Sequence, residues 1–299
     1  MKRINIPRDP AAHNSRLIRR PIQRMVWLFL LPTFAAFCIG FLYPFFKGAF
    51  LSFCKFKLTS QWTWVGFSNY IKALSDSSFL HAFWYTALFA FVSVVFINVL
   101  AFTVAYFLTK GIRGSNLFRT VFFMPNLIGG IVLGYIWSMI FDGILSRYGT
   151  SILLETKYGF WGLIILMCWQ QVGYMMIIYI AGLQAVPEDM LEAARIDGAG
   201  HMSQIWHITL PGLKAIIAIK LIMSVGAILS SNTDMILLLY NTATYRTADV
   251  IGTYVYRVGL GEGQFSYTTA VNLFMSIIGF TLTYLANRLS NYLTGSGLW

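Results

Sequence analysis

Six long apolar runs constrain this chain more than any other feature of its sequence. Of its 299 residues, 57% are hydrophobic and 11% are charged, whereas about 25% of the residues of a soluble domain carry a charge. A helix rises about 1.5 Å per residue, so about 20 apolar residues cross a hydrocarbon core of about 30 Å. Helices satisfy their own backbone hydrogen bonds in lipid, and none of the runs alternates as a barrel strand does. The sequence predicts an all-α integral membrane protein whose six transmembrane helices lie at residues 26–50, 82–109, 118–141, 158–184, 213–236 and 266–290.

The formal net charge of +11 follows membrane topology. If the N-terminus is inside, fourteen of the 22 Lys and Arg residues fall on the inner side, with Lys214 and Lys220 counted among them. Positively charged segments stay preferentially in the cytoplasm. We therefore predict that both termini are cytoplasmic, and we expect no nucleic-acid partner. The eight basic residues on the outer side are Lys47, Lys55, Lys57, Lys72, Arg147, Lys157, Arg246 and Arg257.

One membrane domain with two short tails is the predicted organisation. Residues 1–25 form a basic N-terminal tail, and the apolar run after it is too long for a signal-peptide core and lacks a small-x-small cleavage site. Residues 26–292 form the six-helix domain, and residues 293–299 form a C-terminal tail. The three cysteines lie in or beside the runs and suggest no disulfide framework.

Proline and glycine mark irregular points in the runs. Pro44 and Pro125 each remove a backbone donor, so we predict helix kinks there, with a gating role as the alternative. Gly130 and Gly134 form a G-x-x-x-G pattern, which lets another backbone approach closely. We interpret that pattern as ordinary packing inside the bundle.

A polar loop, residues 186–213, separates the fourth and fifth runs and is much longer than a simple turn requires. Pro187 suits the first position of a helix, the two acidic residues after it favour a helix N-terminus, and Gly198 suits the end. These signals predict a short helix over residues 187–197.

Beyond that helix, residues 203–209 can form a second one, which Pro211 would end before the fifth run. Ala193, Ala194 and Gly198 together give a flat surface of small residues that another backbone can approach. A flat centre with a charged rim is typical of a docking surface. The rim is formed by Glu192, Arg195 and Asp197.

This loop resembles the EAA signature of the permease subunits of ABC importers. In that family, E-A-A is followed after three residues by G, and about nine residues later by I-x-L-P; the spacing here matches throughout. The family's loop is a coupling helix, which sits in a groove of a cytoplasmic ATPase and transmits its closure to the spans. The alternative is an ordinary amphipathic surface helix. The resemblance implies the coupling role for Glu192, Ala193, Ala194, Asp197, Gly198, Ile208, Leu210 and Pro211.

Other segments are similar to the carbohydrate-importer branch, over roughly residues 22–292. The likeness is greatest to the first permease of a pair, of the glycerol-phosphate, maltose and oligosaccharide type, although the large extracellular insertion of the maltose permeases is missing. The matching segments are Tyr43-Pro44, Val65-Gly66-Phe67-Ser68-Asn69-Tyr70, Arg119 with Phe123-Met124-Pro125, and Ala181-Gly182-Leu183-Gln184.

The resemblance implies a complex in a bacterial cell membrane. The expected partners are a second homologous permease subunit in a heterodimer, two cytoplasmic ATPase subunits that hold ATP and Mg, and an extracellular solute-binding protein that delivers a carbohydrate, expected to be an oligosaccharide. The binding protein is expected to contact the outer loops, including Asn241–Gln264. Alternating access would follow from ATP-driven closure of the ATPases.

The sequence contains no G-x-x-x-x-G-K-[ST] phosphate loop, so we expect this chain to bind no cofactor itself. A G-x-S-x-G nucleophile turn is also missing, and no enzyme site is predicted. His201 and His207 are six residues apart and lack nearby cysteines, which argues against a metal site.

Polar side chains inside the runs indicate either function or contacts between helices. Trp169, Gln170, Gln171 and Tyr174 lie about 15 Å into the fourth run, near the middle of the bilayer. Such a cluster could stack on a sugar and bond its hydroxyl groups, or the amides could bond neighbouring helices; both readings stay open.

Asn232 and Asp234 lie near the outer end of the fifth run, and Asn272 lies two turns into the sixth. They are candidates for the mouth of a pathway, although Asp234 could simply face outer water. The scarcity of charge inside the runs favours a neutral or weakly charged solute.

Two other classes of membrane protein compete with this interpretation. A secondary transporter that works without an ATPase, carrying a small neutral solute, should show inverted repeats, broken helices or a coupling carboxylate near the midplane, and the sequence suggests none of these. A membrane-embedded enzyme should show a catalytic constellation, and we find none.

Overall fold

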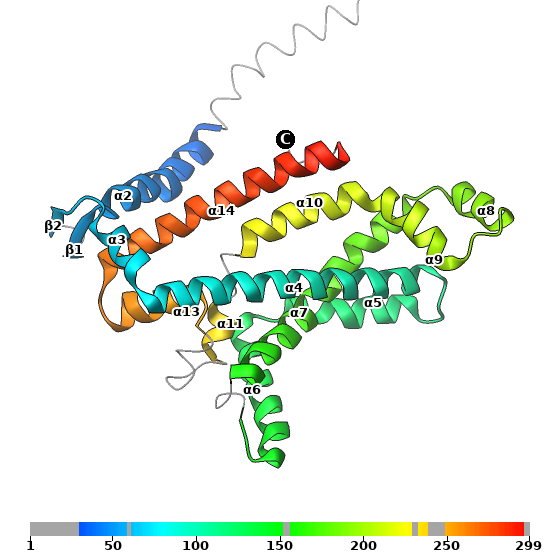
Figure 1. The fold of residues 1–299 in the computed structure, drawn as a ribbon, viewed down its shortest axis with the longest axis horizontal. Coiled ribbons are helices and arrows are strands. Elements are labelled where there is room, and N and C mark those ends of the chain that lie inside the picture. Colours follow the sequence, from blue (N-terminus) through cyan, green and yellow to red (C-terminus); the bar gives the residue numbers. More distant parts are fainter. Residues whose placement is uncertain (1–29, 59–60, 152–155, 229–232, 239–248, 296–299) are drawn as a thin grey trace, which may run out of the picture.

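The computed structural model describes residues 30–58, 61–151, 156–228, 233–238 and 249–295 of the chain. Figure 1 shows a bundle of long helices with a β-hairpin at one end and a helical loop at the other. The elements are η1 (Cys38–Leu42), α2 (Tyr43–Leu51), β1 (Cys54–Leu58), β2 (Gln61–Trp64), α3 (Ser68–Ser75), α4 (Ser77–Thr109), α5 (Ser115–Phe123), η2 (Met124–Leu127), α6 (Gly130–Leu145), η3 (Ser146–Tyr148), α7 (Thr156–Gln184), α8 (Glu188–Ile196), α9 (His201–Gln204), η4 (Ile205–Thr209), α10 (Leu210–Ile228), α11 (Thr233–Leu238), α13 (Ile251–Tyr256), η5 (Arg257–Gly261) and α14 (Phe265–Thr294).

The long helices confirm the all-helical membrane fold. In the described part of the chain, five helices are long and apolar enough to cross a membrane, and they correspond to five of the six predicted runs. A bent pair of helices supplies a sixth crossing if its two halves count as one span. The five are Leu30–Leu51, Ser77–Thr109, Tyr158–Gln184, His201–Ser224 and Phe265–Tyr292.

The third run is not the straight helix predicted for residues 118–141. Its two halves, Ser115–Leu127 and Gly130–Tyr148, meet at 104°. Pro125 lies in the 3-10 turn η2, which ends at Leu127. The two residues after this turn, Ile128 and Gly129, are extended, with ψ of 132° and 144°. Extended backbone cannot continue a helix, so the chain changes direction there instead of merely kinking. The expectation that no helix is broken is therefore wrong, and this feature no longer separates the fold from a secondary transporter.

The G-x-x-x-G pattern lies at the start of α6. Gly134 and its neighbour Leu133 are buried, and α6 packs against α11, where Ile236 is also fully buried. A packing role for the pattern agrees with this arrangement.

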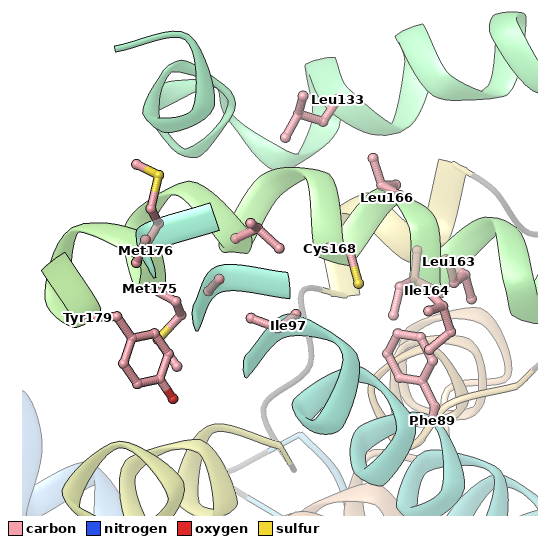
Figure 2. Close-up of a cluster of buried hydrophobic side chains, with 14 of the residues drawn as sticks. Phe89, Ile97, Leu133, Leu163, Ile164, Leu166, Cys168, Met175, Met176 and Tyr179 are labelled. Carbon is pink, nitrogen blue, oxygen red and sulfur yellow. The ribbon is translucent and has the colours of Figure 1, made fainter. Parts of the chain in front are cut away.

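Helix α7 is the centre of the core. More than half of its most apolar window is buried, a larger share than in any other described span. Figure 2 shows Leu166 and Met176 of α7 among the side chains of α4 and α6, with Ile97 and Leu133 nearby. A helix that is apolar on all sides and buried by its neighbours fixes where those neighbours lie.

Gly173 permits the tightest contact of α7. A Cβ at this position would overlap the carbonyl group of Phe122 in α5 and would lie 2.8 Å from the Cα of Phe123. Only a residue without a side chain lets the two backbones approach so closely. The first half of the bent pair, Ser115–Leu127, is thereby held against α7.

One end of the bundle carries the hairpin β1–β2, which is antiparallel and pairs Cys54 with Trp64. The amide of Asn69 in α3 donates to the carbonyl oxygens of Ser52 and Cys54, at 2.9 and 3.0 Å. The Tyr70 and Ser52 hydroxyl groups lie 2.6 Å apart. Asn69 and Tyr70 in the segment 65–70 therefore fix the hairpin to α3.

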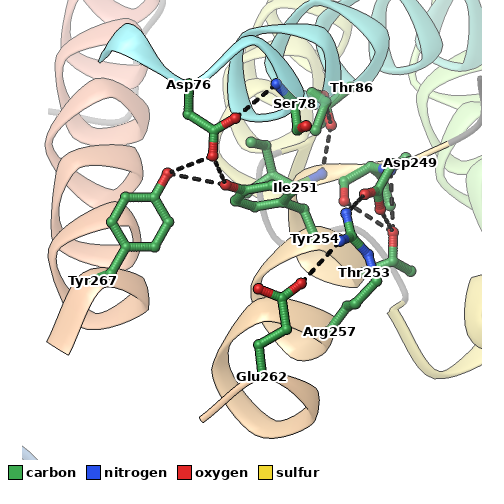
Figure 3. Close-up of polar contacts among 12 residues, drawn as sticks. Asp76, Ser78, Thr86, Asp249, Ile251, Thr253, Tyr254, Arg257, Glu262 and Tyr267 are labelled. Carbon is green, nitrogen blue, oxygen red and sulfur yellow. Dashed lines mark hydrogen bonds and ion pairs between the residues drawn. The ribbon is translucent and has the colours of Figure 1, made fainter. Parts of the chain in front are cut away.

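A polar network ties three elements, α4, α13 and α14, together at this end of the bundle (Figure 3). The Asp76 carboxylate, which caps α4, accepts hydrogen bonds from Tyr254 of α13 at 2.7 Å and Tyr267 of α14 at 3.4 Å. The two tyrosine hydroxyl groups are 2.9 Å apart. Beside them, Arg257 pairs with Asp249 at 2.6 Å.

Burial of Asp76 alone would raise its pKa, but hydrogen bonds from Tyr254, from the backbone amides of Ser78 and Phe79, and from Tyr267 stabilise the carboxylate. The net effect lowers the pKa below the ordinary value of 3.8. A lowered pKa means that the folded protein binds this proton less tightly than the unfolded chain does. The network therefore contributes stability above pH 3.8 and loses it as the pH falls through the lowered pKa.

We predict that Gly173→Ala destabilises the protein by about 3 kcal/mol or more, because the new methyl group meets backbone atoms that cannot move aside. The melting temperature of the detergent-purified protein measures the effect. Gly143→Ala is the control, since a Cβ at that position of α6 has open space. Equal melting temperatures for the two variants would contradict the close contact.

We predict that Asp76→Asn lowers the melting temperature at neutral pH, because Asn caps the helix but offers the tyrosines no charge. The difference from the natural protein should shrink as the pH falls below 3.8 and should disappear below the lowered pKa of Asp76. Melting curves at a series of pH values test this. A difference that is independent of pH would show that the ionised carboxylate has no such role.

Candidate functional site: the polar loop and the membrane pathway

The polar loop, residues 186–213, lies at the end of the bundle opposite the hairpin, and α8 projects beyond the other helices (Figure 1). The predicted short helix over 187–197 is confirmed, because α8 spans Glu188–Ile196 with Pro187 and Asp197 as its caps. Its first turn is acidic and Arg195 lies in its last turn, as the helix macrodipole favours.

A left-handed glycine ends α8. Gly198 has a φ of 79°, and the Ala199 amide donates to the Ala194 carbonyl at 2.8 Å across this turn. No atom of the described chain lies within 4 Å of a Cβ built at Gly198. Within this chain, then, the glycine is required for the turn and not for close packing.

The second short helix differs from its prediction. It begins at His201, and after the π-helical turn η4 it continues into α10 without a break. The expectation that Pro211 ends it is therefore wrong. In η4 the Leu210 amide donates to the Ile205 carbonyl, five residues back, which shifts the hydrogen-bond register. Pro211 is then the second residue of α10, directly after this shift.

Gln204 holds the loop in shape, and no local sequence pattern indicates this role. Its side chain is 4% exposed, and its amide donates to the Ala199 carbonyl at 2.8 Å. Its backbone amide donates to the Gly200 carbonyl at 3.1 Å. The turn after α8 is thus bonded to the helix that enters the membrane.

Two glycines join the loop closely to the spans. A Cβ at Gly182 of α7 would lie 2.5 Å from Leu213 and 2.6 Å from Ile216 of α10. A Cβ at Gly212 would lie 3.1 Å from Val186. Both ends of the loop are therefore packed against each other.

The loop also exposes large apolar side chains. Ile196 is 87% exposed and Met202 is 70% exposed, while Met190 and Trp206 are more than half exposed. Ala193 is exposed and Ala194 is half-buried. An apolar surface of this kind with charged residues around it fits a protein partner. The charged residues around it are Glu188, Asp189, Glu192, Arg195 and Asp197.

No metal site was predicted at the loop histidines, and the ring of His207 instead contacts the Ser203 carbonyl at 2.9 Å. In the described residues, no group of three or more His, Cys, Asp or Glu side chains has the arrangement needed for a metal ion.

The pathway candidates of α7 do not form one cluster. Trp169 packs against Trp137 of α6, with ring centroids 5.5 Å apart. Tyr174 lies about 140° further around the helix, where the ammonium group of Lys220 in α10 is 4.8 Å from its ring. Gln171 is about 60° from Tyr174 and shares its face. Gln170 is buried and has a polar partner, as the structural reading of the amides allows.

Asn272 is exposed on α14 and lines a groove of about 530 Å³ between α14 and α13. Ser276, Thr283 and Thr233 also line it, so the groove is partly polar. Asn232 lies outside the described residues. Asp234 belongs to α11, but its side chain is not among those described.

A larger groove of about 950 Å³ lies between α4, α7 and the polar loop. Its walls are almost entirely apolar and aromatic, and Tyr179 donates to Asn98 at 2.6 Å beside it. Such walls suit hydrocarbon better than a sugar, and none of the predicted pathway residues lines it.

Comparison with known proteins assigns a family to this arrangement. The family described as "Binding-protein-dependent transport system inner membrane component" matches residues 97–293, which include the whole polar loop.

Two relatives are named permease proteins. The chain is 30% identical to the polygalacturonan/rhamnogalacturonan transport system permease protein of Bacillus subtilis, over 95% of this chain and 92% of that protein. It is 37% identical to the probable starch degradation products transport system permease protein of Thermoanaerobacterium thermosulfurigenes, over 62% of this chain and 66% of that protein.

Solved structures show the same fold. A chain of a bacterial ABC transporter involved in the import of the acidic polysaccharide alginate has a TM-score of 0.82 and 26% identity, over 93% of this chain and 99% of that one. A second structure contains the alginate transporter in complex with an alginate pentasaccharide-bound periplasmic protein, with the same TM-score and 25% identity. The family match, the permease relatives and the shared fold agree, and this chain therefore belongs to the family of inner membrane components of binding-protein-dependent transport systems.

Proposed function

We propose that this chain is the membrane-spanning permease subunit of an ATP-driven importer, and that it forms the translocation pathway for a carbohydrate, an oligosaccharide, together with a second homologous permease subunit. An extracellular solute-binding protein delivers the solute. Two cytoplasmic ATPase subunits bind ATP and Mg, and this chain binds neither. The importer resides in a bacterial cell membrane.

The polar loop carries this proposal. Its α8 surface is exposed at one end of the bundle, while its two ends are packed against each other at Gly182 and Gly212. Force applied to α8 therefore reaches α7 and α10 instead of being lost in a flexible loop. A partner can shift such an element only through contacts that differ between two states. The ATPase contacts are assigned to Glu192, Ala193, Ala194, Asp197, Gly198, Ile208, Leu210 and Pro211.

The solute class rests on the pathway side chains and on the relatives. Those relatives are named for starch degradation products and for polygalacturonan and rhamnogalacturonan, and all of these are carbohydrates. In this chain, Trp169, Gln171 and Tyr174 supply aromatic faces and an amide at mid-membrane depth, and Asn272 adds an amide nearer the outside. We assign Gln171, Tyr174 and Asn272 to the pathway, with Trp169, Gln170, Asn232 and Asp234 as the weaker candidates.

The proposed topology places the polar loop and both tails, residues 1–25 and 293–299, in the cytoplasm, with residues 26–292 as the membrane domain. The hairpin, α3 and the outer network then face the solute-binding protein. This orientation agrees with the distribution of Lys and Arg in the sequence.

Co-purification and uptake test the proposal together. A tagged chain expressed with its neighbouring genes should bring down ATPase subunits, and the complex in proteoliposomes should accumulate an oligosaccharide only when ATP is present. A secondary transporter, the competing class, would transport without ATPase subunits. Uptake by the chain alone, driven by an ion gradient, would overturn the proposal.

We predict that Ala194→Asp reduces recovery of the ATPase subunits about tenfold or more, because an unpaired carboxylate is placed on the docking surface. Ala194 suits this test better than Gly198, where a φ of 79° strains any side chain. The control is Asn116→Asp, which adds the same charge to an exposed position of α5. Unchanged ATPase recovery and uptake with Ala194→Asp would exclude this surface.

We predict that Gln204→Ala loosens the polar loop, because the Ala199 carbonyl loses a hydrogen bond worth about 1–3 kcal/mol when its buried partner is removed. Amide hydrogen exchange over residues 198–204 should become faster, and more ATP should be hydrolysed per solute molecule imported. Ser203→Ala, at an exposed position of the same short helix, should change neither quantity. Normal exchange and normal coupling in Gln204→Ala would show that the bond does not stiffen the loop.

A further inference from the structure

Lys220 is a charged residue in the middle of the membrane. It lies ten residues beyond the start of α10 at Leu210, which is about 15 Å along the helix. Tyr174, which it contacts, lies ten residues before the end of α7 at Gln184, also about 15 Å from the cytoplasmic end. The two counts agree on the midplane of a core of about 30 Å. The assignment of Lys220 to the inner side, made from sequence, is therefore corrected.

The contact that the structure shows for the Lys220 ammonium group is the face of the Tyr174 ring, at 4.8 Å. Among the described side chains, no carboxylate forms an ion pair with it. A cation over an aromatic ring keeps much of its hydrogen-bonding capacity, because the ring offers no lone pairs. The three donors of the ammonium group remain available to a solute.

A lysine at this depth is expensive unless it faces water or an anion. Its four-carbon stem is too short to bring the charge back to the headgroup region over about 15 Å. Lys220 and Tyr174 are both partly exposed in this chain. The charge meets this requirement if Lys220 and Tyr174 face an aqueous pathway, on the side of α7 that also carries Gln171.

We propose that Lys220 is the charge-selective contact of this pathway and that the solute is an acidic oligosaccharide, whose uronate carboxylate binds the ammonium group while a sugar ring lies near Tyr174. This inference rests on the proposed function and replaces the expectation of a neutral or weakly charged solute. A single lysine balances the single charge of a carboxylate. A phosphate carries about −1.5 to −2 at neutral pH and would be balanced only in part.

The test uses the complete importer, purified with its ATPase subunits, and compares two matched probes. Trigalacturonate carries a carboxylate on each ring, and galactotriose carries a hydroxymethyl group in its place. Saturation-transfer NMR without the solute-binding protein measures binding to the membrane subunits directly. We expect about tenfold tighter binding of trigalacturonate, since a hydrogen bond to a charged group has that effect.

Variants of the lysines identify the source of the preference. Lys220→Met should bind both saccharides equally, and Lys220→Arg should keep the preference for trigalacturonate. Lys214→Met is the matched control, because it removes a charge from an exposed position of the same helix and should leave the preference intact. Size-exclusion chromatography of each complex confirms assembly, and the Arg variant tests the charge if the Met variant fails to assemble.

Equal binding of the two saccharides by the natural complex would overturn the inference, and so would a preference that survives Lys220→Met. Failure of the proposed function gives a different result, namely no ATP-driven uptake of any oligosaccharide in the presence of the binding protein. ATP-driven uptake of neutral oligosaccharides alone, unaffected by Lys220→Met, would refute the charge selectivity and leave the importer function in place.

Discussion

Close approach between helices at the glycines of α7 and α10 is the contact on which the rest of this structure depends. Gly173 lets α5 lie against α7, Gly182 lets α10 lie against α7, and Gly212 lets the start of α10 lie against Val186. At Gly173 and Gly182 a Cβ would overlap atoms of the neighbouring helix, and at Gly212 it would lie in tight contact with Val186, at 3.1 Å. In a membrane, where the hydrophobic effect does not press helices together, contacts of this kind hold a bundle.

These contacts connect the polar loop to the middle of the membrane. Helix α7 carries Tyr174 and α10 carries Lys220, and the same two helices enter and leave the loop. Because Gln204 fixes the turn inside the loop, movement of α8 moves the ends of both helices. At the other end, the network around Asp76 ties α4, α13 and α14 together. Under the proposed function, force on the polar loop moves α7 and α10 relative to the end of the bundle that this network holds together.

Hydropathy and helix-capping residues predict the spans and the helix α8. The features that they miss depend on the direction of the chain and on packing between helices. Apolar length located five spans, and Pro187 with Gly198 located α8. Hydropathy indicates how long an apolar run is but not its direction, so it could not predict the 104° bend at Ile128 and Gly129. Closeness in sequence grouped Trp169 with Tyr174, although the helix turns them to different faces. The π-helical turn before Pro211 and the bond from Gln204 depend on three-dimensional packing that no local pattern encodes.

Under the proposed function, the polar loop moves as one rigid piece with α7 and α10. Spin labels can be attached at Arg195 on α8 and at Lys214 on α10, both of which are exposed. The distance between the two labels is then measured by double electron–electron resonance in the assembled importer, with and without ATP. We predict that the Arg195 to Lys214 distance stays the same in both states, while Lys214 moves relative to the second permease subunit. A loop that swings, with Arg195 moving relative to a stationary Lys214, would contradict the account.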